Sequence, residues 1–371
     1  MDNYIKTYGI EKKRKKLPTA SKIIFLITAL TVALHIISYF SEAFSDFFNL
    51  RISSIIRFIT ANITNFIPFS LAEALIVLIP VIAFVLIRHA VKNHSDSWGS
   101  VLTYIASLIS VICLFYVLFF WSFGVGYNTT SIDKNLELDR KDVNAEELYN
   151  TALILAEKSN EEAKNVAFRS MNFSIMPYDI GELSEKLNED YKTFSKENKF
   201  LSNMRSNLKP VILSRAMSYT HITGIYSYFT GEANLNTHFP DYTLPFTAAH
   251  ELAHQRGIAR EDEANFIAFL VCKDSADPYI RYSAYVNMLD YFLNALYIAD
   301  ADLYAKVLRN LNGNIIYELI AYSDFFDPFR DSIASSVSGS INDTYLKLNG
   351  TEGEKSYGMV VDLAVAYYKN H

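Results

Sequence analysis

Three runs of apolar residues near the amino terminus constrain the fold of this 371-residue chain more than any other feature. The first, Ile23 to Phe40, has 18 residues and no Asp, Glu, Lys or Arg. The second, Leu71 to Ile87, contains Glu73 and Pro80, and the third, Val101 to Val125, has no charged residue. A bilayer core about 30 Å thick needs about 20 apolar helical residues. We therefore expect a membrane anchor over residues 1–125, with transmembrane helices at about 23–40, 71–87 and 101–125.

Positive charges predict the orientation of these helices. A basic cluster, Lys12 to Lys16, precedes the first run, and Arg88, His89 and Lys92 follow the second. Cytoplasmic ends of membrane helices carry the excess of positive charge. This rule predicts a multi-pass protein of the cell membrane, with the lipid bilayer as a partner and the chain after Gly126 outside the cytoplasm. The mixed polar and apolar segment 51–69 is predicted to lie on the membrane surface.

The second predicted domain, 126–371, has the polarity of a soluble protein, and its patterns are mostly helical. Helical spacing covers about 145–156, 180–198, 279–299, 301–322 and 358–369, and strand residues gather in 220–236. The expected fold class is mainly α (α+β), with a helix-rich domain and a small β-sheet after the transmembrane helices. A net charge of −6 provides no basic field for nucleic acid. The two cysteines, Cys113 and Cys272, are too few for a disulfide framework.

One motif of the second domain carries recognisable chemistry: His250-Glu251-Leu252-Ala253-His254. Pro245 is well placed in the first turn of the helix that would carry it. On that helix, His250 and His254 are one turn apart and project from one face, so two imidazoles can bind one Zn²⁺ ion. Glu251 between them can hold and deprotonate a zinc-activated water, which makes it the candidate catalytic residue.

Zinc needs a third protein ligand and an open fourth position in a catalytic site. Gly257 can end the first helix, and a second helix begins near Arg260 with three acidic residues. We favour Glu261 as the third ligand, since Asn265 lies one turn further on the same face and can hydrogen-bond a ligand there. Glu263 is the alternative third ligand. It points about 160° away from Glu261 on an ideal helix, so only one of the two can bind the ion.

The motif and the acidic segment together resemble known families. His250-Glu251-x-x-His254 followed by Glu261-x-x-Ala264-Asn265 is similar to the gluzincin pattern of CAAX prenyl proteases and β-lactam sensor-transducer peptidases. In those families the first Glu of the second segment is the zinc ligand, which implies Glu261 here. The departure is the linker, because only six residues separate His254 from Glu261.

A closer likeness extends over about residues 101–371. It resembles a bacterial family of membrane-anchored zincin-like proteins known only as a domain of unknown function. This resemblance implies a zincin-like fold, a metal and a membrane anchor, but no substrate. It rests on the segments Phe229-Thr230-Gly231-Glu232-Ala233-Asn234, Leu244-Pro245-Phe246-Thr247, His254-Gln255, Glu261-Asp262-Glu263-Ala264-Asn265-Phe266 and Ser356-Tyr357-Gly358.

Two further features have both a functional and a structural interpretation. Gly231, Glu232 and Asn234 lie in a segment that can form the edge strand on which many zincins align an extended peptide, or an ordinary hairpin strand. Tyr282 and Tyr285 can donate to an oxyanion at the zinc, although packing is the interpretation that we favour.

The leading hypothesis is a membrane-anchored zinc metallopeptidase that hydrolyses peptide bonds outside the cytoplasm, with Glu251 as the general base. Two alternatives stay open at this point. One is a non-catalytic sensory or binding domain that keeps zinc for structure, and the other is an amidase that acts on cell-envelope material by the same chemistry.

Overall fold

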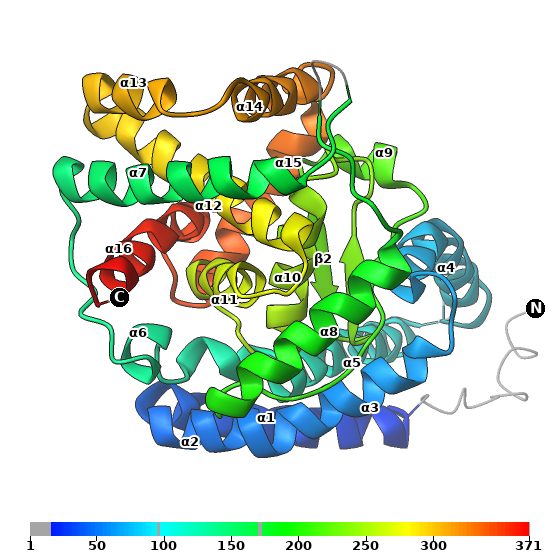
Figure 1. Ribbon diagram of the computed structural model, residues 1–371. Helices are drawn as coiled ribbons and strands as arrows, with labels where there is room; N and C mark the ends of the chain where they lie inside the picture. Colours follow the sequence, from blue (N-terminus) through cyan, green and yellow to red (C-terminus); the bar gives the residue numbers. More distant parts are fainter. Residues whose placement is uncertain (1–15, 95–96, 170–172, 371) are drawn as a thin grey trace, which may run out of the picture.

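The computed structural model describes residues 16–94, 97–169 and 173–370, and it shows a mainly helical protein with one small sheet (Figure 1). The expected fold class is confirmed. Most of the basic cluster used for the orientation, Lys12 to Lys15, lies outside the described residues.

Three described helices are long and apolar enough to cross a membrane: α1 (Thr19–Phe40), α4 (Leu71–His94) and α5 (Trp98–Ser122). They coincide with the three expected runs, although α4 continues through the basic residues and α5 ends before Val125. Helices α1 and α5 pack side by side, and the Trp121 indole donates to the Thr31 hydroxyl at 3.0 Å. Nearly all apolar side chains of α4 are exposed, as expected of a helix that faces lipid.

The segment between α1 and α4 is helical and packs onto the rest of the protein. It comprises α2 (Glu42–Phe47), the π-helix η1 (Phe48–Ser53) and α3 (Ser54–Asn65). One face of α3 exposes Ile55, Ile59 and Ile63, which suits the predicted membrane surface. The opposite face buries Arg57 completely and contacts the sheet. The segment therefore joins the apolar helices to the rest of the chain.

Most of the remaining chain is helical. The described elements, in chain order, are η2 (Gly124–Asn128), α6 (Ile132–Asn135), α7 (Ala145–Glu162), η3 (Ala163–Asn165), α8 (Ile180–Glu197), α9 (Ser214–Ser218), α10 (Thr243–Gln255), α11 (Glu261–Lys273), α12 (Pro278–Ala299), α13 (Ala301–Arg309), α14 (Gly313–Phe326), α15 (Ile333–Leu348), η4 (Gly353–Met359) and α16 (Val360–Asn370). Asn144 starts α7 with a capping box in which the Glu147 side chain bonds back to the Asn144 backbone.

The sheet has three strands in the order β1-β3-β2, formed by β1 (Lys209–Pro210), β2 (Gly224–Ser227) and β3 (Glu232–Leu235). Strand β3 is central: it pairs with β1 in parallel and with β2 antiparallel. The segment predicted as an edge strand is therefore not one, and β2 is the edge strand beside α10.

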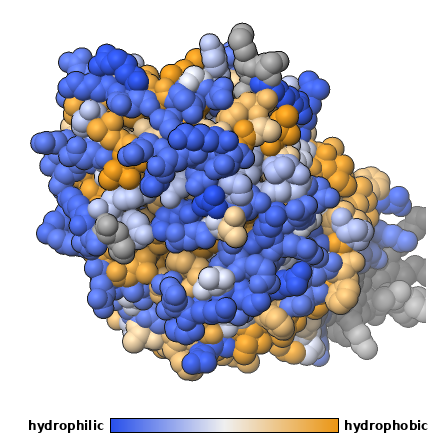
Figure 2. All heavy atoms as spheres, in the orientation of Figure 1, coloured by the Kyte–Doolittle hydropathy of each residue, from blue (hydrophilic) through white to orange (hydrophobic). Residues whose placement is uncertain are grey.

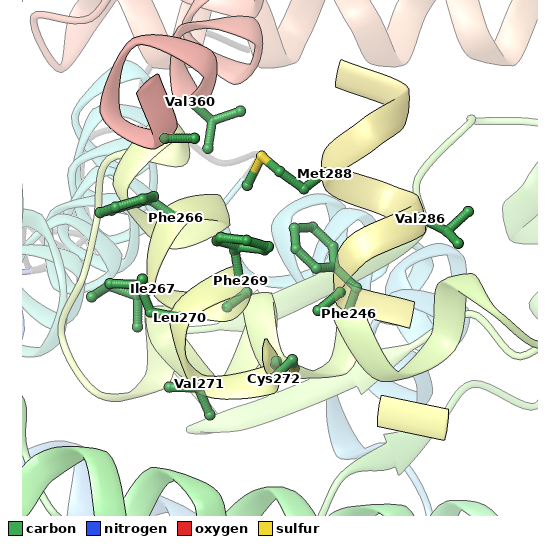
Figure 3. Close-up of a cluster of buried hydrophobic side chains, with 14 of the residues drawn as sticks. Phe246, Phe266, Ile267, Phe269, Leu270, Val271, Cys272, Val286, Met288 and Val360 are labelled. Carbon is green, nitrogen blue, oxygen red and sulfur yellow. The ribbon is translucent and has the colours of Figure 1, made fainter. Parts of the chain in front are cut away.

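Helices α10, α11 and α12 form the centre of the hydrophobic core. Their apolar side chains interdigitate, with Phe246 of α10 and Phe269 of α11 among those drawn in Figure 3. Twelve of the 13 residues of α11 are buried, the three acidic residues of its first turn included. Hydrophilic residues cover most of the face over α7 and α8, and hydrophobic residues gather toward its lower and right-hand edges (Figure 2). The core thus holds the motif helix rigidly, which is what a preorganised site requires.

Candidate metal centre

Helix α10, which carries the two histidines, and helix α11, which carries Glu261, are joined by a short turn. Helix α10 ends at Gln255, and Gly257 adopts a positive φ of 107° that turns the chain toward α11. A Cβ atom at Gly257 would also lie 2.6 Å from a guanidinium nitrogen of Arg57. Glycine is therefore required at position 257 both by the backbone conformation and by the close approach of Arg57 from α3.

The turn brings three predicted ligands together. The Oε2 atom of Glu261 lies 3.1 Å from Nε2 of His250 and 3.3 Å from Nε2 of His254. One ligand atom from each of the three buried residues lies within 4.8 Å of the other two. Among the residues that the structure describes, this is the group of histidine and acidic side chains arranged to hold a metal ion.

The two imidazoles present their Nε2 atoms to this point. The Nδ1 atom of His254 is 2.7 Å from the carbonyl oxygen of Ile258, so Nδ1 carries the proton and donates it. In the neutral form of the ring, that bond places the lone pair on Nε2, which is the tautomer that a metal ligand needs. The Nδ1 atom of His250 is buried and has no partner within the described residues.

The electrostatics show how strongly the three groups interact. Burial alone would raise the pKa of the Glu261 carboxyl, but His254 and His250 outweigh it and hold that pKa well below its usual range. Burial alone would lower the pKa of His254, but Glu261 and Glu251 raise it to about 9. A proton therefore neutralises the metal-free cluster at neutral pH, at the position where a divalent cation would bind.

Glu251 lies between this cluster and the edge strand β2. The backbone N–H of Tyr226 lies near enough to the Glu251 carboxylate to act on its pKa, and one carboxylate oxygen is buried without a partner among the described residues. Burial raises the pKa of the carboxyl. At Gly224, a Cβ atom would lie 2.7 Å from the Glu251 carboxylate, so the strand backbone can approach this closely only because a glycine stands there.

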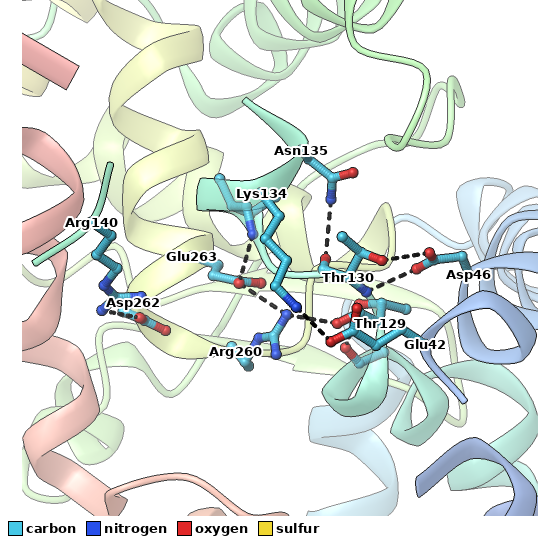
Figure 4. Close-up of polar contacts among 12 residues, drawn as sticks. Glu42, Asp46, Thr129, Thr130, Lys134, Asn135, Arg140, Arg260, Asp262 and Glu263 are labelled. Atoms are coloured by element: carbon cyan, nitrogen blue, oxygen red, sulfur yellow. Dashed lines mark hydrogen bonds and ion pairs between the residues drawn. The ribbon is translucent and has the colours of Figure 1, made fainter. Parts of the chain in front are cut away.

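The alternative ligand, Glu263, is committed elsewhere. Its Oε1 atom accepts from the backbone N–H of Ile132 at 2.9 Å and lies 3.0 Å from Arg260 (Figure 4). Asp262 similarly pairs with Arg140 at 2.8 Å. Of the three carboxylates in the first turn of α11, Glu261 thus faces the histidines. The other two, Glu263 and Asp262, bind residues of the segment after α5.

Asn265 is buried on α11, but its side-chain nitrogen has no hydrogen-bond partner among the described residues. The expected bond to a histidine or to Glu261 is not present. The side chain lies beside the Tyr291 hydroxyl instead.

The residues predicted to align a substrate have structural roles. Glu232 accepts hydrogen bonds from the first two backbone N–H groups of α4, at 3.0 and 2.9 Å, and the Ser70 hydroxyl donates to Asn234 at 2.6 Å. The Gly231 carbonyl accepts from Gln255 at 2.6 Å. The polar residues of this strand therefore cap α4, one of the helices long and apolar enough to cross a membrane, because a buried helix start leaves N–H groups that need acceptors.

Aromatic residues near the cluster come from positions that the sequence reasoning missed. Tyr282 donates to Glu318 and Tyr285 packs on Phe269, so both serve in packing. Tyr345 of α15 lies near enough to Glu261 to interact with it electrostatically, and its hydroxyl accepts from Tyr127 at 3.1 Å. Burial raises the pKa of Tyr345, which keeps the hydroxyl protonated.

Phe123 also contacts the cluster, with its ring edge-to-face at 5.6 Å from the His254 ring. It follows α5 directly, so the third apolar helix ends against the His250–His254–Glu261 cluster. No spacing in the sequence could have linked Phe123 or Tyr345 to a motif more than 90 residues away.

Comparison with known proteins identifies a family. The family described as Protein of unknown function (DUF3810) matches residues 44–365, from within α2 to within α16. Searches of the curated proteins and of the solved structures found no match. The matched range holds α4, α5, the sheet and the whole His250–Glu261 cluster. The chain therefore belongs to the family described as Protein of unknown function (DUF3810).

Proposed function

We propose that this protein is a membrane-anchored, zinc-dependent metallopeptidase. One observation carries the proposal: two Nε2 atoms and a carboxylate oxygen converge, and a second buried carboxylate, Glu251, stands beside them with one oxygen unpaired. The residue pattern of the two segments, His250-Glu251-x-x-His254 and Glu261-x-x-Ala264-Asn265, resembles that of the gluzincins and supports the same assignment, although the linker between them is shorter.

The residues fit zinc in kind and in number. Two neutral imidazoles and one carboxylate form a donor set of catalytic zinc sites, whereas closed structural sites use four protein ligands. Within the described residues the cluster offers three ligands, which leaves a position for water or substrate. When bound, zinc supplies a Lewis acid that activates water near neutral pH.

The chain's own groups can perform the remaining steps. The unpaired Glu251 oxygen can accept a proton from the attacking water and pass it to the leaving amine, and its raised pKa suits this exchange. Tyr345 can donate its proton as a hydrogen bond to the developing oxyanion from the Glu261 side. Strand β2 is an edge strand beside Glu251, so an extended peptide can pair with it.

The decisive experiment compares wild type with Glu251→Gln, using the full chain purified in detergent and loaded with zinc. We expect the variant to keep its zinc, measured by elemental analysis, and to lose at least about 1,000-fold of its cleavage of internally quenched peptides. Glu185→Gln, an exposed glutamate on α8, is the matched control and is expected to retain full activity.

Equal activity in wild type and Glu251→Gln would refute the proposed chemistry. Zinc binding without hydrolysis of peptides or cell-envelope amides by wild type would favour the non-catalytic alternative. Hydrolysis of envelope amides alone would identify the amidase alternative. The extracytoplasmic position of the site belongs to the same proposal, and protease protection in oriented vesicles tests it.

A further inference from the structure

Helix α15 exposes an apolar stripe that the fold does not cover. Ile333, Val337, Ile341 and Leu348 are 83%, 53%, 65% and 82% exposed, and their spacing places them on one face of the helix. The buried side chain of α15, Leu346, lies on the opposite face. From Ser332 to Asn342 the sequence has no charged residue. A helix on the surface of a soluble protein normally turns its apolar face inward. Helix α15 instead turns most of its apolar face outward.

The sheet indicates which side of the domain faces the membrane. Helix α10 packs on the sheet, against β2 and β3. Glu232 and Asn234 project from one face of the sheet and hydrogen-bond the start of α4 there. Because α4 enters the membrane from that contact, this face of the sheet is turned toward the bilayer. Ile225 pairs with Asn234 and shares its face, and it is exposed.

Both ends of α15 are tied to this membrane-side layer. At its C-terminal end, the Tyr345 ring lies 6.0 Å from Phe119, which is in the last turn of the membrane helix α5. At its N-terminal end, Ser332 donates to the carbonyl of Tyr219, just after α9. The loop before α9 is itself held by α4, because Glu73 accepts from the backbone N–H groups of Ile212 and Leu213. In Figure 1, α15 passes behind α12, and α8 lies in front.

Other apolar residues lie beside the membrane helices α4 and α5. Ile212 and Leu213 are exposed beside the start of α4. Phe229, in the β2–β3 turn, contacts Phe115 at 6.0 Å, two turns before the end of α5. The β2–β3 turn therefore lies beside a part of α5 that belongs to the apolar run 101–125.

We propose that α15 is an interfacial helix whose apolar stripe, Ile333, Val337, Ile341 and Leu348, inserts into the outer surface of the same bilayer that α1, α4 and α5 span. The partner is lipid rather than a second protein, because the two ends of α15 contact α5 and the segment that α4 holds. An uncharged, serine-rich flank beside the stripe can remain at headgroup depth. The proposal concerns the lipid contact alone and does not depend on zinc or on peptidase activity.

Depth-dependent quenching tests this proposal on the full chain. Starting from a Cys113→Ser background, single cysteines are introduced by Val337→Cys or Ile341→Cys and labelled with an environment-sensitive fluorophore; Cys272 is buried and does not react. The protein is reconstituted into phosphatidylcholine vesicles with and without a nitroxide on the lipid acyl chain. We expect quenching at both positions comparable to that of Ile82→Cys in α4.

Ile298→Cys, an apolar position at the end of α12 that is 87% exposed and so at least as accessible as positions 337 and 341, is the control and is expected to be quenched several-fold less. Quenching at 337 and 341 no stronger than at 298 would overturn the proposal. Labels at 337 and 341 that both lipid nitroxide and aqueous iodide fail to reach would also overturn it, since a protein partner would then cover the stripe.

Discussion

The choice between two glutamates depends on contacts of single atoms. Glu261 lies at 3.1 and 3.3 Å from the two Nε2 atoms, whereas Glu263 holds Ile132 and Arg260. Helix geometry alone predicts that only one of the two can face the histidines, because they project in nearly opposite directions. It cannot say which, since Ile132 lies 131 residues away in the sequence.

The two glutamates should therefore differ in metal binding. Glu261→Gln is expected to lower the zinc content of the purified full chain from about one ion to a small fraction, because one of three ligands loses its charge. Glu263→Gln is expected to keep zinc near the wild-type level. Elemental analysis after dialysis measures both, and the opposite ranking would overturn the assignment.

A second residue-scale prediction concerns Asp190 on α8. One of its carboxylate oxygens is buried without a partner among the described residues, and burial raises its pKa to about 6. The folded state therefore holds the proton more tightly than the unfolded chain, whose Asp pKa is about 3.9. Stability from this group is complete below about pH 4 and is lost as pH rises through about 6.

Asp190→Asn removes this titration. We expect the variant to unfold at a higher temperature than wild type at pH 7.5, by an amount equivalent to about 1–2 kcal/mol, and at a similar temperature at pH 4.5. Thermal unfolding in detergent, followed by intrinsic fluorescence, measures the difference. Glu185→Gln on the same helix, which is exposed, should show no pH-dependent gain.

At the scale of elements, the strand predicted to bind substrate caps a membrane helix instead. The error has a physical cause. Strand β1, which makes β3 central, is only Lys209–Pro210, and two residues give no alternating pattern to detect. The expected helix 301–322 is similarly two helices, α13 and α14, because Asn312 caps a new start.

Long apolar or amphipathic runs were predictable because their patterns are local. The three apolar helices, α8, α12 and the motif helix all follow from spacing within the segment itself. The strand order and the aromatic residues at the cluster depend on contacts between distant segments, which a single sequence does not encode in any pattern.

The cap predicts a stability effect for Glu232. Glu232→Ala leaves two N–H groups at the start of α4 without acceptors, and we expect a loss of about 1–2 kcal/mol in unfolding free energy. Glu232→Gln, which keeps one acceptor oxygen, should lose less. Thermal unfolding measures both variants. If Glu232→Ala kept full stability but impaired peptide binding, the structural role would be wrong.

At the scale of the whole molecule, one buried cation, Arg57, joins the segment between α1 and α4 to the helix α10 that carries the two histidines. Arg57 donates to Asn49 and to the carbonyl of Ser122 at 2.8 Å, and Asn49 donates to the carbonyl of Gly257 at 3.0 Å. Burial lowers the pKa of Arg57 to about 10, so it is still charged at neutral pH. These hydrogen bonds thus connect Arg57 of α3, through Asn49, to the turn between α10 and α11.

Arg57 and Asn49 should act as a unit. Arg57→Met and Asn49→Ala are each expected to destabilise the full chain by about 2–3 kcal/mol, because each leaves buried carbonyls without donors. The double variant should lose clearly less than the sum of the two. A double-mutant cycle by thermal unfolding in detergent measures this, and strict additivity would contradict the shared network.

The hydrogen bond from Asn49 to Gly257 has a practical meaning for anyone who wants to isolate the part of this protein that carries the His250–His254–Glu261 cluster. A fragment begun at residue 126, the boundary that hydropathy suggests, would lack Asn49, Arg57 and the ring of Phe123 that lies against His254. In such a fragment the turn at Gly257 would open onto water where the intact chain has protein. The fragment is therefore expected to bind metal at the His250–His254–Glu261 cluster more weakly than the full chain.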